Sequence, residues 1–110
     1  MQSGNTGLLP GTLDLLVLTT LSKGPAHGYA ISQSMRLLSG GALDVEQGSL
    51  YPALYRMERK GWIKSKWTVS DTNRRVKAYR LTSSGEKHAN DERASWEAFV
   101  AAVSGVVKGA

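Results

Sequence analysis

Cysteine is absent from this chain of 110 residues, which excludes disulfides, thiolate metal sites and cysteine nucleophiles. Long apolar runs are absent too. The longest one, residues 98–103, is far shorter than the roughly 20 residues that a membrane-spanning helix needs. The first residues carry no basic stretch of the kind that opens a secretory signal. We therefore expect an unprocessed, soluble protein of the cytoplasm that makes no membrane contact.

Common catalytic motifs are also missing. The chain contains no G-x-S-x-G, G-x-x-x-x-G-K-[ST], H-E-x-x-H or G-x-G-x-x-G sequence. Its two histidines, His27 and His88, are far apart and have no second ligand at metal-binding spacing. The acidic residues form no evident pair for acid–base work. The sequence therefore predicts no enzyme, no metal site and no cofactor.

The chain does have positive charge, and most of it lies in one segment. The formal net charge is +5, and nine Lys and Arg residues lie between Arg56 and Arg80, against only Glu58 and Asp71. Such a segment is typical of proteins that neutralise phosphates, because the release of counterions drives binding to nucleic acid. A solvated basic face that aids solubility is the alternative, and charge alone leaves both open.

Hydrophobic periodicity predicts three helices in the first half of the chain. Residues 12–21 are apolar on most sides, as in a helix buried against several neighbours. A second helix, residues 27–38, has a stripe formed by Ile31, Met35 and Leu38. The third is expected to open at Gly48 and Ser49, with Ser49 as its cap and Pro52 in its first turn. Its core face comprises Leu50, Leu54 and Met57, and its outer face comprises Pro52, Tyr55, Arg56 and Arg59.

A hairpin and a long helix are predicted for the second half. Residues 63–70 and 76–81 read as strands joined by a polar, basic turn, and Trp62 and Trp67 are expected to anchor this hairpin to the helices. Ser83 and Glu86 form a capping box that opens the last helix. The apolar positions of that helix form one continuous stripe, which consists of Trp96, Phe99, Val100, Val103, Val106 and Val107.

This order of elements favours a mainly α fold with a small β-hairpin. Three helices followed by a hairpin is the order of a winged helix-turn-helix, whose third helix enters the major groove. We expect a flexible N-terminal arm at residues 1–10 and the DNA-binding domain at residues 11–82. The rest, residues 83–110, is expected to be a long dimerisation helix, because an exposed apolar stripe can be buried by a second copy.

Several ordered motifs also resemble the signature of PadR-family transcriptional regulators over about residues 8–88. The motifs are His27-Gly28-Tyr29-Ala30-Ile31; Gln47-Gly48-Ser49-Leu50-Tyr51-Pro52-Ala53-Leu54 followed by Gly61-Trp62-Ile63; and Asn73-Arg74-Arg75 followed by Tyr79-Arg80-Leu81-Thr82 and Gly85. The opening Leu9-Pro10-Gly11-Thr12-Leu13 is similar to the short subgroup that has a single C-terminal helix.

The resemblance implies a cytoplasmic homodimer that binds operator DNA as a repressor, with the last helix supplying the dimer contacts. It also implies a candidate effector, because the family often responds to small aromatic or hydrophobic molecules, in some members held between the subunits. Trp96 and Phe99 could stack on such a molecule, or they could simply be buried against the partner subunit.

The residues expected to serve these roles fall into two sets. The DNA-binding candidates are Gln47, Ser49, Tyr51, Pro52, Tyr55, Arg56, Lys64, Lys66, Asn73, Arg74 and Arg75; the dimer-interface candidates are Trp96, Phe99, Val100, Val103 and Val107. Tyr51 and Arg56 are expected to distinguish DNA sequences, and the hairpin to contact the backbone. Lys64 and Lys66 could equally serve solubility. The alternative function is a winged-helix protein-interaction module, which would present an apolar outer face on the third helix.

Overall fold

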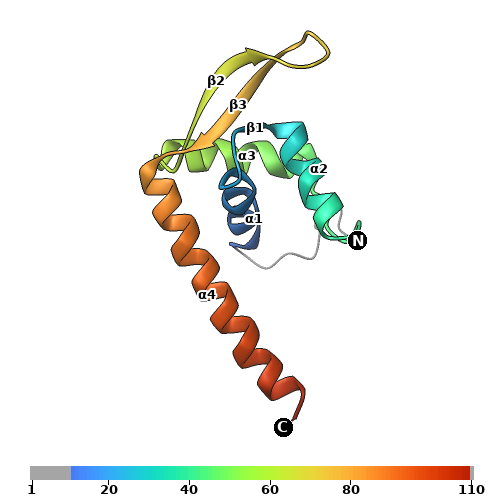
Figure 1. The fold of residues 1–110 in the computed structure, drawn as a ribbon, viewed down its shortest axis with the longest axis vertical. Coiled ribbons are helices and arrows are strands. Elements are labelled where there is room, and N and C mark those ends of the chain that lie inside the picture. Colours follow the sequence, from blue (N-terminus) through green and yellow to red (C-terminus); the bar gives the residue numbers. More distant parts are fainter. Residues whose placement is uncertain (1–10, 110) are drawn as a thin grey trace.

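The computed structural model describes residues 11–109, and the predicted N-terminal arm lies outside them. Figure 1 shows helices gathered under a protruding hairpin, with one long helix leading away. The helices are α1 (Thr12–Leu21), α2 (Gly28–Leu38), α3 (Gln47–Arg59) and α4 (Ser83–Val107), and the strands are β1 (Ala26–His27), β2 (Ile63–Val69) and β3 (Arg75–Leu81). The predicted winged helix-turn-helix with a long C-terminal helix is confirmed.

The hydrophobic core lies where α1, α2 and α3 meet the base of the sheet. Val17 and Leu18 of α1 are fully buried, as expected for a helix without a polar face. Leu50, Leu54 and Met57 of α3 are also fully buried, which confirms the predicted core face of that helix. In α2 the predicted stripe is right for Ile31 and Met35 but wrong for Leu38, which is 70% exposed because it lies in the last turn, beyond the neighbouring helices.

The sheet has three strands in the order β1-β3-β2, all antiparallel, so the expectation of a simple hairpin is incomplete. β1 pairs Ala26 with Tyr79 and His27 with Ala78. A strand of two residues is too short to show the alternation of apolar and polar residues by which a strand is predicted from a sequence. β2 and β3 pair along their whole length, from Ile63 opposite Leu81 to Val69 opposite Arg75.

Both predicted helix caps are displaced. α3 begins at Gln47 after Glu46, whose carbonyl accepts from the amides of Ser49 (3.0 Å) and Leu50 (3.0 Å). Ser49 therefore lies inside the helix and is not its cap, and Pro52 lies in the second turn. α4 is capped by Thr82, whose hydroxyl accepts from the Gly85 amide at 3.0 Å, so the predicted capping box at Ser83 is wrong by one residue.

The two tryptophans near the wing differ in burial. Trp62 is half-buried against the core, and its ring stacks on His88 of α4 with 3.9 Å between ring centroids. Trp67 is 57% exposed, so the prediction that it anchors the hairpin to the helices is wrong. It shares a face of β2 with the buried Ile63, but the hairpin has by then extended past the helices.

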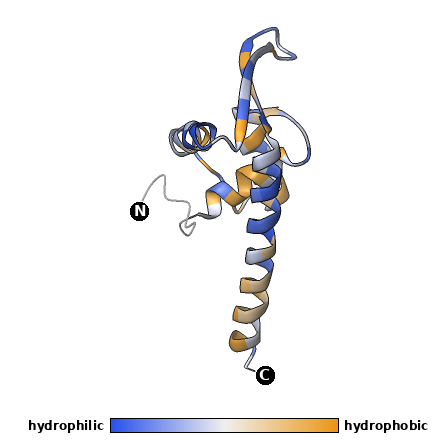
Figure 2. Ribbon diagram, turned by 90° about the vertical axis from the view of Figure 1, so that its left-hand side faces the viewer, coloured by the Kyte–Doolittle hydropathy of each residue, from blue (hydrophilic) through white to orange (hydrophobic). Residues whose placement is uncertain are grey.

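α4 extends well beyond the rest of the fold. The described residues measure 54 × 34 × 21 Å, and only Gly85 and Ala89, near its beginning, are buried. Figure 2 shows that its C-terminal half is hydrophobic although little packs against it. No helix within residues 11–109 combines the length and the apolar character that a bilayer crossing requires.

Candidate nucleic-acid interface

The outward face of α3 carries small, aromatic and cationic side chains. At 100° per residue, Gly48, Pro52, Tyr55 and Arg59 lie opposite the core residues of this helix. Gly48 has open space around the position of a side chain, and Tyr55 is 64% exposed with the Arg59 guanidinium 5.8 Å from its ring centroid. The small residues near the start of the helix allow its backbone to approach a surface closely.

Arg56 lies on the flank of α3 that faces α1, where its guanidinium is paired with the Asp14 carboxylate. The Asp14 side chain is only 19% exposed, whereas that of Arg56 is 48% exposed. The sequence suggested a free guanidinium that could read a guanine edge. In the structure, the guanidinium already has a partner in Asp14, which lies 42 positions earlier in the chain and which spacing alone does not reveal.

Tyr51 and Gln47 lie on the opposite flank, toward α2 and the wing. The Tyr51 ring packs over Gly28, where an added methyl group would come within 2.4 Å of the Tyr51 hydroxyl oxygen. The Gln47 side-chain amide donates to the Ser32 hydroxyl of α2 at 3.2 Å. Tyr51 and Arg56, which were expected to act together, therefore lie on different sides of the helix.

The wing tip is a tight polar turn. The Asn73 amide donates to the Ser70 carbonyl (2.9 Å), and the Ser70 amide donates to the Arg74 carbonyl (2.8 Å). Asn73 has a φ of 62°, a left-handed conformation that Asn tolerates better than most residues. This backbone role accounts for an asparagine at position 73, and Asn73, Arg74 and Arg75 are all exposed.

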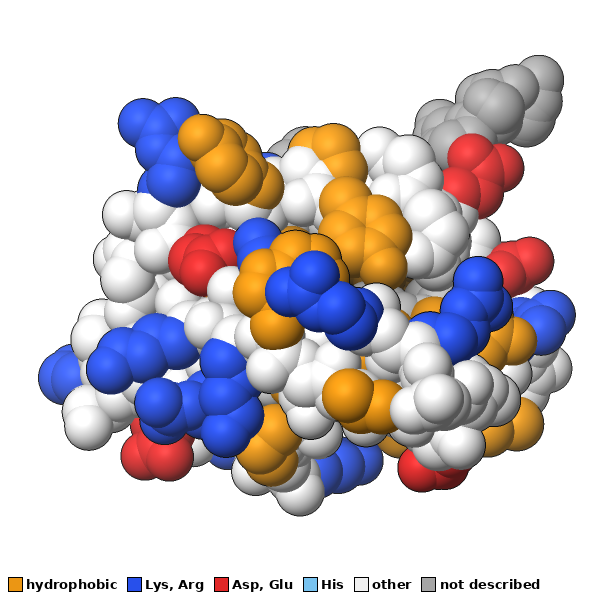
Figure 3. All heavy atoms as spheres, turned by 90° about the horizontal axis from the view of Figure 1, so that it is seen from above, with side chains coloured by type: hydrophobic (Ala, Val, Ile, Leu, Met, Phe, Trp, Pro, Cys, Tyr) orange, Lys and Arg blue, Asp and Glu red, His pale blue; other side chains and the backbone are white. Residues whose placement is uncertain are grey.

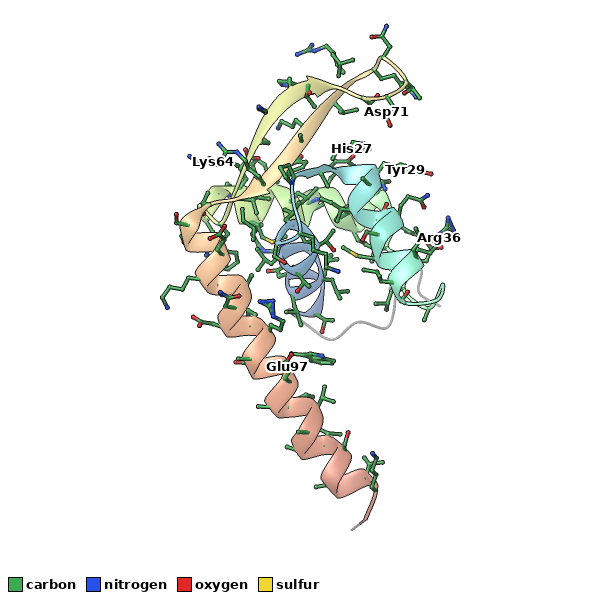
Figure 4. All side chains as sticks on the ribbon, viewed as in Figure 1. His27, Tyr29, Arg36, Lys64, Asp71 and Glu97 are labelled. Carbon is green, nitrogen blue, oxygen red and sulfur yellow. The ribbon has the colours of Figure 1, made fainter. Side chains whose placement is uncertain are left out.

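The wing has two basic faces. The inner wing face, which continues from the buried Ile63 and Tyr79, consists of Trp67, Val69, Arg75 and Lys77; the outer wing face consists of Lys64, Lys66, Thr68 and Arg80. Lys64 and Lys66 thus do not share a face with Arg75. Figure 4 shows Lys64 near the base of the hairpin, at the edge of the sheet away from His27 and Tyr29. Seen from the wing end, Lys and Arg side chains predominate over carboxylates, with hydrophobic groups between them (Figure 3).

A cleft of about 1060 Å³ separates the inner wing face from the start of α2 and α3. Its lining includes His27, Tyr29, Tyr51, Trp67, Asp71, Arg74, Arg75, Lys77 and Tyr79. The sequence reasoning missed His27, Tyr29, Trp67 and Lys77 as members of this surface. For Trp67 and Lys77 the hairpin register was the available signal, since it puts them opposite each other.

Tyr79 is among the residues that line this cleft, and it is buried. Burial raises the pKa of its phenol above the ordinary value, and the negative charge of Glu58 raises it further, with a smaller contribution from Tyr51. Glu58 also accepts a hydrogen bond from Ser65 of β2 at 2.6 Å, which ties α3 to the wing. The phenol is therefore neutral at physiological pH and can donate a hydrogen bond.

The dimer candidates of α4 are all exposed in the single chain. The exposed fraction of Trp96, Phe99, Val100, Val103 and Val107 ranges from 39% for Val100 to 77% for Val107, and the Trp96 and Phe99 rings lie 6.2 Å apart. A soluble protein rarely leaves so continuous an apolar surface in water.

A helical core, an outward-facing third helix and a basic wing define the winged-helix class of DNA-binding proteins. Residues 17–91 match the transcriptional regulator PadR-like family. The chain belongs to this family, whose members are DNA-binding transcriptional regulators and not enzymes.

Two known proteins, one of them matched both by structure and by sequence, illustrate the similarity. The crystal structure of a PadR-like transcriptional regulator from Bacillus cereus matches with a TM-score of 0.81 and 26% identity, over 94% of this chain and 99% of that one. Bacillus subtilis PadR in complex with operator DNA matches with a TM-score of 0.66 and 28% identity, over 74% of this chain and 46% of that one. By sequence, the negative transcriptional regulator PadR of Bacillus subtilis is 29% identical over 79 residues, 72% of this chain and 43% of the relative.

Proposed function

We propose that this chain is a homodimeric, cytoplasmic repressor that binds an inverted-repeat operator. The observation that carries the proposal is the distribution of exposed side chains. Basic and aromatic groups occupy the outer face of α3 and the wing, and a separate apolar stripe occupies α4. Bacillus subtilis PadR, a negative transcriptional regulator whose structure is of a complex with operator DNA, supports repression and an operator as the target.

In this proposal α3 enters the major groove with its outward face. Pro52, Tyr55 and Arg59 approach the base edges most directly, and Tyr51 and Arg56 lie at either side of them. Gln47 and Ser49 are near the start of the helix, where they can reach the neighbouring backbone. The wing arginines Arg74 and Arg75 contact phosphates, and Lys64 and Lys66 add positive charge from the outer wing face.

The dimer places two such units on one duplex. A two-fold axis relates two identical α3 helices, so the operator contains two related half-sites about 10 base pairs apart or a multiple of that spacing. The apolar stripe of α4 supplies the interface, because burying it against a second copy removes it from water.

Sedimentation and DNA titration test this proposal. The wild type is expected to sediment as a dimer and Val100→Asp/Val103→Asp as a monomer. A matched control, Ala94→Asp/Ala101→Asp, adds the same charge to the opposite side of α4 and is expected to remain dimeric. A wild type that is already monomeric at concentrations of tens of micromolar would overturn the dimer, since obligate dimers have dissociation constants well below about 1 μM.

The alternative, a protein-interaction module, is less well supported. Such a module would need an apolar outer face on α3, whereas Tyr55 and Arg59 make this face polar and cationic. A small aromatic effector remains a candidate partner, and a thermal shift on adding one would reveal it, because a ligand stabilises the fold it binds.

A further inference from the structure

We infer that Glu58 positions the wing for operator recognition, because its carboxylate, bound to Ser65 of β2, fixes the angle between α3 and the hairpin. Glu58 lies in the last turn of α3, and the Ser65 hydroxyl donates to its Oε2 atom at 2.6 Å in a partly buried contact. This inference rests on the proposed function and adds to it a residue that acts through the wing without touching DNA. Glu58 is thus a positioning residue.

Ser65 lies in a row of the sheet that is connected to both α2 and α3. Across this row, Ala26 of β1 pairs with Tyr79 of β3, and Tyr79 pairs with Ser65 of β2. β1 runs directly into α2, so the chain itself holds one end of the row. The hydrogen bond to Glu58 holds the other end to α3. The base of the wing therefore has a connection to each of the two helices.

Ser65 is also the point at which the hairpin leaves the helices. Along this side of β2, Ile63 is buried, Ser65 is half-buried and Trp67 is exposed. Beyond this point the hairpin stands clear of the helices (Figure 1), and its strands stay paired to their ends. At about 3.3 Å per residue, Ser70 lies roughly 16 Å beyond Ser65, so a rotation of about 10° at Ser65 moves the end of the wing by about 3 Å.

The charge of Glu58 argues against a direct contact with DNA. Glu58 and Asp71 are the only acidic residues between Arg56 and Arg80, and a carboxylate in this basic segment repels phosphates. The pKa of the Tyr79 phenol, raised first by burial and then by the charge of Glu58, indicates that the carboxylate lies close to the base of the wing. Its contribution to recognition therefore comes from the hydrogen bond to the wing.

Removing the Ser65 hydroxyl tests the inference. Ser65→Ala removes the hydrogen bond without changing the net charge, and Ser65→Thr keeps a hydroxyl at the same position. The matched control is Thr20→Val, because the Thr20 hydroxyl donates at 2.8 Å to the Leu16 carbonyl within α1 and this bond connects no two elements. Urea unfolding of each variant measures the effect on stability alone.

Fluorescence anisotropy then compares two duplexes, one that the wild type selects from a random pool and one of the same composition in scrambled order. Ser65→Ala is expected to bind the selected duplex about tenfold more weakly, because a wing that is free to rotate must be ordered on binding. Its affinity for the scrambled duplex and the salt dependence are expected to stay unchanged, since a loose wing still neutralises phosphates. Ser65→Thr and Thr20→Val are expected to behave as the wild type.

Glu58→Gln separates the hydrogen bond from the charge. The amide oxygen can still accept from Ser65, whereas the negative charge is gone. This variant is therefore expected to bind both duplexes more tightly by the same factor and to keep the wild-type ratio of the two affinities. Glu58→Ala, which removes the acceptor as well, is expected to lower that ratio as Ser65→Ala does.

Hydroxyl-radical footprinting of the selected duplex shows where the wing lies. The sugars that the wing covers are those that Arg74→Gln/Arg75→Gln exposes, and Ser65→Ala is expected to weaken protection at the same sugars. A Ser65→Ala variant with the wild-type affinity ratio and footprint would overturn the inference and leave the proposed function standing. So would a Ser65→Thr variant that fails to restore the ratio, or a Thr20→Val variant that lowers it equally. A wild type that enriches no sequence from the pool would overturn the proposed function, and the inference with it.

Discussion

At the scale of single residues, Arg56 of α3 has two competing partners. One is Asp14, with which it forms an ion pair, and the other, in the proposed function, is DNA. The Arg56 side chain of the pair is 48% exposed, so removing the pair with Asp14→Asn is expected to lower the free energy of unfolding by less than about 1 kcal/mol. The same substitution frees the guanidinium for DNA. We therefore expect Asp14→Asn to bind a duplex more tightly and Arg56→Ala to bind it less tightly.

The matched control is Asp44→Asn, an exposed position between α2 and α3 that changes the net charge equally. Urea denaturation measures stability, and anisotropy measures DNA affinity. If Asp14→Asn binds no better than Asp44→Asn, and Arg56→Ala binds as well as the wild type, Arg56 holds α3 to α1 and takes no part in the interface.

Tyr79 makes the stability of the fold depend on alkaline pH. Because burial and Glu58 raise the pKa of the phenol, the folded state binds this proton more tightly than the unfolded state does. The stabilisation is fully present below the ordinary tyrosine pKa of about 10 and is lost as pH rises through the folded-state value. We expect the melting temperature to fall less steeply above about pH 10 in Tyr79→Phe than in the wild type.

Thermal unfolding followed by circular dichroism between neutral and strongly alkaline pH checks this expectation. Tyr29→Phe is the control, because Tyr29 is exposed at the start of α2. The comparison concerns only the pH dependence, so a general loss of stability in Tyr79→Phe does not affect it. If plots of melting temperature against pH run parallel for Tyr79→Phe and the wild type, this phenol does not cause the loss of stability at alkaline pH.

At the scale of the elements, the start of α4 makes a close junction with the segment that follows α3, in addition to packing against α1. Besides capping α4, the Thr82 hydroxyl donates to the Gly61 carbonyl at 2.6 Å, and the Thr82 amide donates to the Trp62 carbonyl at 3.0 Å. A methyl group at Gly85 would lie 1.9 Å from that same Trp62 oxygen. The start of α4 can therefore approach the end of α3 this closely only with glycine at position 85.

We expect Gly85→Ala to destabilise the protein by about 1–3 kcal/mol or more, because backbone atoms would have to separate. The control is Gly48→Ala, which adds the same methyl group to a helix in open space and should raise stability by up to about 1 kcal/mol. Urea unfolding of the two variants measures the difference. Equal stabilities would mean that α4 can shift away from Trp62 at no cost.

The helices and strands also show which features of the fold can be predicted from sequence patterns and which cannot. The core face of α3 and the order of helices and strands follow from periodicity, because burial on one side repeats along each element. β1, the Asp14 partner of Arg56 and the exposure of Trp67 could not be predicted in this way. Each depends on which segments distant in sequence lie side by side, and alternation along β2 cannot tell where the sheet leaves the helices.

At the scale of the whole molecule, the stripe on α4 and the surface on α3 are expected to be coupled through the dimer. A dimer that places two α3 helices on one duplex neutralises the phosphates of both half-sites, so its salt dependence sums over both subunits. A monomer engages one half-site only. Each linked subunit also raises the effective concentration of the other on the same operator.

We therefore expect the monomeric Val100→Asp/Val103→Asp variant to bind with about half the wild-type slope of log K against log salt. The probe is a duplex that carries an inverted repeat found in the DNA beside the gene, compared with a duplex in which one half-site is scrambled. Scrambling should weaken the wild type strongly and leave the variant almost unaffected, because a monomer can use the intact half-site. Ala94→Asp/Ala101→Asp should behave as the wild type on both duplexes. A monomeric variant that keeps the full slope and still distinguishes the two duplexes would show that each chain contacts both half-sites by itself, and that DNA recognition does not depend on the α4 interface.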